Sequence, residues 1–175
     1  MLLPLPFPTP AVLAPPSPQG ASAPEPIHAF DFLEGRWRIR HRRLKGILCG
    51  SSEWTTFDTL QDVRPLVGRL GTLSEMRSPS GEPVGVTLHL FEKASGTWSL
   101  YWLGKGGTLE VPVVGGFSSG VGTFLAKDEY QGRPIRVRWT WTRTTTRSPQ
   151  WEQAFSADGG RTWETNWVMS YEPAR

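Results

Sequence analysis

The feature that most constrains this chain is an alternation of apolar and polar residues, with a period of two, that begins at Trp37 and recurs almost to the C-terminus. In its first run Trp37, Ile39 and His41 share one face, and arginines fill the positions between them. Side chains alternate across a β-strand but recur every 3.6 residues on a helix. The chain therefore contains strands with one buried and one solvated face.

The same alternation predicts four further strands, each with one apolar face. These faces are Val86, Leu88 and Leu90; Trp98, Leu100 and Trp102; Ile135, Val137, Trp139 and Trp141; and Trp163, Thr165, Trp167 and Met169. Weaker strand candidates span residues 53–60, 72–77, 109–117, 121–126 and 151–156. Turn signals rich in glycine and serine separate these segments, and a helical pattern is confined to a turn near residues 27–33.

About ten short strands joined by tight turns favour antiparallel neighbours, because a parallel pair would need a long crossover connection. A meander of that length must close, or split into two sheets, to cover its edge strands. The predicted fold is therefore all-β, an antiparallel up-and-down barrel of about 8–10 strands.

The first 28 residues form a separate segment, since they hold nine of the sixteen prolines. Proline removes backbone donors and fixes φ, so this segment is expected to be a disordered tail, with the barrel domain spanning residues 29–175. A secretory signal is the alternative, because Ala21-Ser22-Ala23 resembles a cleavage site. No lysine or arginine precedes the apolar residues of this segment, which favours a cytoplasmic location over secretion.

Nine tryptophans are the most informative part of the composition, and seven of them fall on the predicted apolar faces. They are therefore expected to line an interior. A barrel of about eight strands can hold one small ligand. No run of about 18 apolar residues is present, so the sequence contains no membrane-spanning helix. Cys49 is the single cysteine and cannot form an internal disulfide.

Three segments carry a resemblance to a known family: Phe32-Leu33-Glu34-Gly35-Arg36-Trp37, the run from Gly96 to Trp102, and the region from Trp151 to Trp167. A Gly-x-Trp that opens the first strand resembles the lipocalins and calycins. Over residues 29–171 the chain looks like a bacterial lipocalin-like family of unknown function. The resemblance implies a barrel with an internal cavity, closed at one end by Trp37, and it implies no catalytic residues.

A second motif runs from Ser156 to Trp163 and matches the pattern Ser-x-Asp-x-Gly-x-Thr-Trp, the Asp-box of sialidases and other propellers. A propeller needs several blades at a fixed period, and this chain has a single copy. We therefore interpret the motif as a hairpin turn in which Asp158 accepts backbone hydrogen bonds, and we reject a sialidase.

An arginine-rich run from Arg36 to Lys45 raises the alternative of a polyanion-binding module. Without the first 28 residues the net charge is +4, from 19 basic and 15 acidic side chains, which is modest for such a partner. Base stacking needs aromatic rings beside the charge. The alternation places the tryptophans on the opposite face, which argues against nucleic acid.

The three histidines, His28, His41 and His89, lack the spacing of a zinc site, so no metal is expected. His89 falls opposite the apolar face of its strand and is expected to point outward. His41 shares the face of Trp37 and could serve in the interior as a hydrogen-bond donor, a general base or a haem ligand. The sequence identifies no cofactor.

If the strands reverse at every turn, a set of side chains gathers at the open end of the barrel or on its inner wall. The expected ligand-binding residues are His41, Trp54, Arg77, Trp102, Trp139 and Trp163. The predicted function is binding of a small apolar or aromatic molecule in a tryptophan-lined cavity. The alternative is an enzyme that uses the cavity for isomerisation, cyclisation or haem-assisted chemistry. The sequence alone names neither the ligand nor the oligomeric state.

Overall fold

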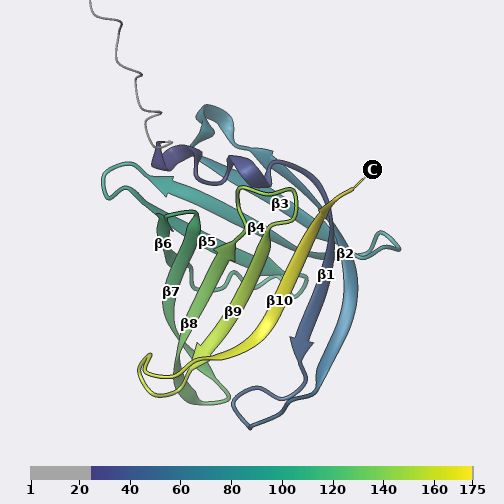
Figure 1. Ribbon diagram of the computed structural model, residues 1–175, viewed down its shortest axis with the longest axis vertical. Coiled ribbons are helices and arrows are strands. Elements are labelled where there is room, and N and C mark those ends of the chain that lie inside the picture. The colour runs from purple at the N-terminus through teal and green to yellow at the C-terminus, as the bar shows by residue number, and fades with distance from the viewer. Residues whose placement is uncertain (1–24, 175) are drawn as a thin grey trace, which may run out of the picture.

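The computed structural model describes residues 25–174, and in it ten antiparallel strands form a closed barrel (Figure 1). Each strand pairs with the next along the chain, and β1 closes the ring against β10. The predicted all-β up-and-down barrel is confirmed. The strands are β1 Gly35–Leu44, β2 Trp54–Pro65, β3 Gly71–Arg77, β4 Pro83–Glu92, β5 Thr97–Gly104, β6 Val113–Ser118, β7 Val121–Tyr130, β8 Arg133–Thr142, β9 Gln150–Ser156 and β10 Glu164–Pro173.

The period of two explains the inner wall of most strands. On β1 the residues Trp37, Ile39 and His41 are buried, and the arginines between them are exposed. On β8 the predicted apolar face is buried from Ile135 to Trp141. Because strand pairing places directly opposite residues on the same face, the residues of a known inner face also identify the inward positions of the neighbouring strands.

One end of the barrel is closed by the segment that precedes β1. Two short 3-10 helices, η1 Pro26–His28 and η2 Asp31–Leu33, lie across this end, and a third, η3 Val67–Arg69, follows β2 (Figure 1). The carbonyl of Pro26 accepts a hydrogen bond from Trp98 Nε1 at 3.0 Å, so η1 is attached to the barrel wall. The rest of the predicted tail, residues 1–24, lies outside the described residues.

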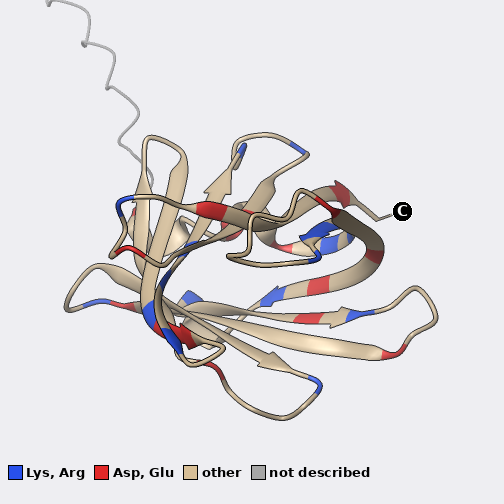
Figure 2. Cartoon of the chain, turned by 90° about the horizontal axis from the view of Figure 1, so that it is seen from below, with Lys and Arg blue, Asp and Glu red and all other residues tan. Residues whose placement is uncertain are grey.

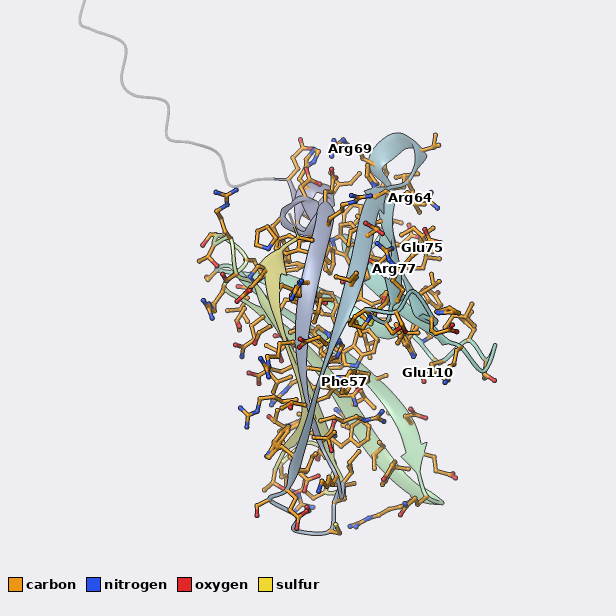
Figure 3. All side chains as sticks on the ribbon, turned by 90° about the vertical axis from the view of Figure 1, so that its right-hand side faces the viewer. Phe57, Arg64, Arg69, Glu75, Arg77 and Glu110 are labelled. Carbon is orange, nitrogen blue, oxygen red and sulfur yellow. The ribbon has the colours of Figure 1, made fainter. Side chains whose placement is uncertain are left out.

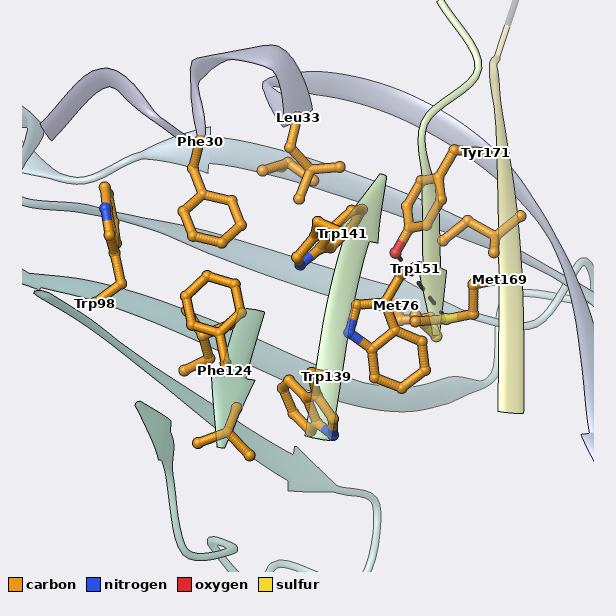
Figure 4. Close-up of a cluster of buried hydrophobic side chains, with 14 of the residues drawn as sticks. Phe30, Leu33, Met76, Trp98, Phe124, Trp139, Trp141, Trp151, Met169 and Tyr171 are labelled. Atoms are coloured by element: carbon orange, nitrogen blue, oxygen red, sulfur yellow. Dashed lines mark hydrogen bonds between the residues drawn. The ribbon is translucent and has the colours of Figure 1, made fainter. Parts of the chain in front are cut away.

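Phe30 fills the closed end from inside. Its side chain is 1% exposed, and its ring lies 4.9 Å from Trp98 and 5.8 Å from Phe124, centroid to centroid (Figure 4). Trp37 joins this plug by donating a hydrogen bond from Nε1 to the carbonyl of Leu33 at 2.7 Å. The expectation that Trp37 lies at a closed end therefore matches the structure.

The predicted inner face of β4 is wrong. His89 is 2% exposed and points inward, where its Nδ1 lies 3.0 Å from Thr72 Oγ1 and its ring 4.2 Å from that of Phe30. Val86, Leu88 and Leu90, which were expected inside, lie on the outer side and are only partly buried. A histidine is tolerated in this core because Thr72 satisfies one ring nitrogen and burial keeps the imidazole neutral, lowering its pKa to about 3.

The predicted inner face of β10 is correct from Trp167 onward and wrong for the residues before it. A β-bulge between Thr165 and Trp167 inserts Asn166 as an extra residue, which interrupts the alternation. Trp163 therefore precedes the strand and does not join its inner face. The Arg138 guanidinium, on the outer side of β8, lies 4.3 Å from the Trp163 ring centroid.

The Asp-box segment forms the predicted turn. The carboxylate of Asp158 accepts hydrogen bonds from the backbone N–H groups of Arg161 and Thr162, at 2.9 and 3.0 Å, and from the Thr162 hydroxyl at 2.6 Å. These donors hold the pKa of Asp158 well below its usual range. Gly159 and Gly160 adopt positive φ angles of 78° and 98°, which the turn requires.

Candidate functional site

The half of the barrel away from η1 and η2, called here the mouth half, contains an inward-facing ring that is not covered. Phe57 on β2 lies directly opposite the buried His41 on β1, and the two rings stack at 4.4 Å with an interplanar angle of 9°. His41 is fully buried, whereas Phe57 is 39% exposed. Phe57 is therefore an inward-facing aromatic ring that keeps part of its surface open to solvent.

His41 is held by two hydrogen bonds. Trp167 Nε1 donates to its Nδ1 at 3.0 Å, and its Nε2 lies 2.8 Å from Thr59 Oγ1. An indole N–H can only donate, so Nδ1 must be the acceptor, and the ring proton sits on Nε2, which donates to Thr59. Burial lowers the pKa of His41 to about 4, against an opposing effect of the Asp58 carboxylate. His41 is therefore neutral near pH 7, with one tautomer.

A second polar chain crosses the wall formed by β8, β9 and β10. Trp139 Nε1 donates to Gln153 Oε1 at 3.0 Å, and Gln153 Nε2 donates to Asn166 Oδ1 at 3.0 Å. The ring of Trp139 meets that of Trp151 edge to face at 5.2 Å (Figure 4). Large aromatic rings and neutral amides thus make up this wall.

The remaining wall combines another indole with charged groups. Trp102 on β5 lies against the backbone of Gly85, where an added Cβ would come within 2.5 Å of its ring carbons. The Arg43 guanidinium, on the His41 side of β1, lies 4.8 Å from the ring centroid of Trp167. Burial raises the pKa of Glu110, the carboxylate of Asp128 adds to the rise, and Arg43 opposes it.

The structure brings three of the six predicted site residues to the interior. His41, Trp139 and Trp102 lie on the inner faces of β1, β8 and β5. Trp54 lies on the outer side of β2, with the Arg42 guanidinium 4.9 Å from its ring centroid. The other two, Arg77 and Trp163, also lie apart from this group. Arg77 pairs with Asp62 on the outer face, well separated along β2 from Phe57 (Figure 3).

Sequence reasoning missed three residues of the mouth half. Phe57 belongs to a strand whose alternation was too weak to assign a face, and only its pairing with His41 shows that it points inward. Gln153 lies in another weak strand. Asn166 carried no signal at all, because the bulge that places it next to Gln153 interrupts the pattern on which faces were assigned.

Two hollows on the molecule lie apart from His41. One, of about 570 Å³, is lined by residues of β1, β2, β3 and the end of β10, including Arg36, Asp62 and Arg77. Another, of about 380 Å³, lies between loops at the mouth end beside Leu48 and Trp163. Neither is bordered by Phe57 or Trp139.

The arginine-rich outer face is matched by acidic residues of the neighbouring strand (Figure 2). Arg36 Nε lies 3.2 Å from Asp62 Oδ1, and Arg40 Nε lies 4.0 Å from Asp58 Oδ1. Pairing on a solvated surface leaves less free positive charge for a polyanion than the sequence alone suggests.

The residues present do not fit haem ligation by His41. A haem ligand needs a free ring nitrogen, and both nitrogens of His41 are engaged, by Trp167 and Thr59. Within residues 25–174 no group of three or more His, Cys, Asp or Glu side chains could hold a metal ion. In the same range no helix is long and apolar enough to cross a membrane.

Comparison with known proteins supports the architecture alone. No family model matches the chain, and no curated protein matches it. Among solved structures the chain is similar to Rv2717c from M. tuberculosis, with a TM-score of 0.54 and 12% sequence identity. The alignment covers 87% of this chain and 99% of Rv2717c. At that identity the similarity supports a shared barrel fold and leaves the lipocalin and calycin resemblance without a family match.

Proposed function

We propose that the barrel binds one small aromatic or apolar molecule in its mouth half. The site lies between the stacked pair of Phe57 and His41 on one side and Trp139 and Trp102 on the other. The observation that carries the proposal is the exposure of Phe57, because an inward ring left 39% exposed offers a face on which a flat molecule can stack. Ligand sites are mostly apolar with a few placed polar groups, which matches this wall.

The physical gain comes from covering apolar surface that the fold leaves open. Burial of apolar surface contributes about 25 cal/mol per Å², and an offset or edge-to-face aromatic pair adds about 0.5–1.5 kcal/mol. The neutral state of His41 assists, since an apolar guest would be opposed by a charged imidazole at its side. The closed half offers no comparable surface because Phe30 already occupies it.

A titration with naphthalene, followed through the indole N–H signals of ¹⁵N-labelled protein, tests this proposal. The signals of Trp139 and Trp167 should shift, while that of Trp98, in the closed half, should stay. Replacement of Phe57 by leucine should weaken binding about tenfold. Tyr101→Leu, an aromatic loss on the opposite face of β5 from Trp102, is the matched control and should bind as the native chain does. Unchanged signals in a solution saturated with naphthalene would remove the proposal.

We do not propose an enzyme. General-base chemistry by His41 needs a nitrogen lone pair facing the substrate, and the one lone pair of its neutral ring accepts the Trp167 indole N–H. The polyanion alternative is weakened for a separate reason, because Arg36 and Arg40 already form ion pairs with acidic side chains.

A further inference from the structure

The amide side chains of Gln153 and Asn166 have one allowed orientation, imposed by an indole. Trp139 Nε1 can only donate, so the Gln153 atom that faces it is the oxygen. The Gln153 NH₂ group must then face Asn166, so the Asn166 atom that it meets is also an oxygen. The chain of hydrogen bonds therefore ends on the Asn166 NH₂ group, which points away from Gln153 as a donor.

This terminal donor has no acceptor among residues 25–174, although Asn166 is only 1% exposed. Leaving a buried donor unsatisfied costs about 1–3 kcal/mol, and native structures contain few such groups. The backbone here departs from regular pairing, since Asn166 is the extra residue of the β10 bulge. Bulges are over-represented beside functional sites, where they redirect a side chain.

The position of Asn166 connects it to the proposed site. Its chain neighbour Trp167 donates to His41, whose ring stacks on Phe57. Its hydrogen-bond partner Gln153 lies opposite Trp139, the residue that forms the adjoining wall. The unpaired donor is thus next to the side chains that would hold an apolar guest.

We propose that Asn166 Nδ2 donates a hydrogen bond to an acceptor oxygen of the bound molecule, so that the ligand is an aromatic compound carrying a carbonyl group. This inference rests on the proposed function and adds one polar group, a hydrogen-bond acceptor, to the ligand proposed there. A neutral acceptor is favoured over a carboxylate because two carboxylates, Glu110 and Asp128, already lie close enough to repel each other in this part of the barrel. Asp128 lies opposite the buried Ile135 and therefore faces inward.

The chain offers a direct probe, since Asn166 is its only asparagine. Labelling with asparagine that carries ¹⁵N in its side chain gives a single NH₂ signal. The full chain is titrated with 2-acetylnaphthalene and with 2-isopropenylnaphthalene, which has the same shape but a CH₂ group in place of the carbonyl oxygen. The carbonyl compound should shift the NH₂ signal downfield and bind about tenfold more tightly than its isostere.

Two substitutions test the direction of the hydrogen bonds that run from Trp139 through Gln153 to Asn166. Asn166→Asp keeps the oxygen that Gln153 needs and removes the unpaired donor, so the tenfold preference for the carbonyl compound should disappear. Gln153→Glu presents an oxygen to Asn166, which then turns its NH₂ group toward the new carboxylate, and the preference should again be lost. Gln150→Glu makes the same change on the same strand; it loses the hydrogen bond that Gln150 donates to Glu152, which should lower stability, but it should keep the native preference for the carbonyl compound.

The outcomes separate this inference from the proposed function. Equal affinity for the two compounds, with an unmoved NH₂ signal in the native chain, overturns the role of Asn166 and leaves the apolar site in place. Failure of both compounds and of naphthalene to bind overturns the site itself. The native-chain titration decides the matter even if a variant fails to fold.

Discussion

Both halves of the barrel contain an inward-facing phenylalanine, which is fully buried in the closed half and partly exposed in the mouth half. Phe30 in the closed half is 1% exposed and lies within 5 Å of the Trp98 ring, whereas Phe57 in the mouth half is 39% exposed. The difference arises because the segment before β1 inserts the fully buried Phe30 and Leu33 into one end, whereas Leu48, in the loop after β1, is only partly buried against the core. A barrel filled from one side gains stability there and keeps an apolar surface free at the opposite end.

The surroundings of the two buried histidines differ in the same way as the two phenylalanines. His89 in the closed half is packed against Phe30, and His41 in the mouth half is stacked on a ring that is partly free. Both are neutral because of burial, but the ring stacked on His41 is 39% exposed, whereas the ring beside His89 is 1% exposed. The predictions below test whether the two halves differ as this comparison requires.

The largest effect is expected from truncation of the plug. Phe30→Ala should lower the free energy of unfolding by about 3–5 kcal/mol, since it opens a cavity among packed rings. Phe57→Ala should cost less than about 1 kcal/mol, because its ring is already partly in water. Urea unfolding of both variants measures the contrast. Similar losses would mean that the mouth half is packed like the closed half.

Acid should destabilise the protein through both histidines. Their pKa values in the folded state, about 4 for His41 and about 3 for His89, lie below the ordinary value of 6.5, so the unfolded chain binds more protons between these limits. The stabilising contribution is complete above pH 6.5 and is lost as the pH falls toward 4 and then 3. Each histidine should contribute a slope of about 1.4 kcal/mol per pH unit.

Unfolding measured from pH 7 to pH 4 checks this slope. His41→Gln and His89→Gln should each remove about half of it, since glutamine does not titrate. A flat profile in the native chain would show that neither imidazole is kept neutral by the fold.

Loss of the Trp167 indole donor should have a smaller effect. Trp167→Phe removes the hydrogen bond to His41 Nδ1, costs about 1–2 kcal/mol and raises the pKa of His41, because its Nδ1 can then take a proton. Trp163→Phe, which loses a bond to the carbonyl of Gly160 on the outside, is the matched control. An NMR titration of the His41 ring distinguishes the two, and an equal His41 pKa in both variants would contradict the tautomer assignment.

The smallest effect is expected on the outer face. Asp58→Asn removes the partner of Arg40 from a largely solvated pair, so stability should change by less than about 1 kcal/mol. The pKa of His41 should fall slightly, because the Asp58 carboxylate raises it in the native chain. A rise in that pKa would contradict the raising effect of the Asp58 carboxylate on the His41 pKa.

Much of the fold could be predicted from local pattern. The strongly alternating runs from Trp37 and from Ile135 have the inner faces expected of them, and the turn around Asp158 forms as its motif indicates. The candidate site could be predicted only in part. His41, Trp102 and Trp139 lie inside, while Trp54 and Arg77 lie outside on strands whose face depends on their neighbours.

The sequence by itself determined that this chain forms one-sided strands and that so many of them must close into a barrel, because alternation and turn composition act over a few residues. The tertiary structure decided which end of the barrel is filled, which face of β4 points inward and where Asn166 lies. Those outcomes depend on contacts between residues far apart in the chain, such as Phe30 with Trp141 and Trp139 through Gln153 with Asn166. A pattern of period two carries no information about such contacts, and a single extra residue in a bulge is enough to reverse it.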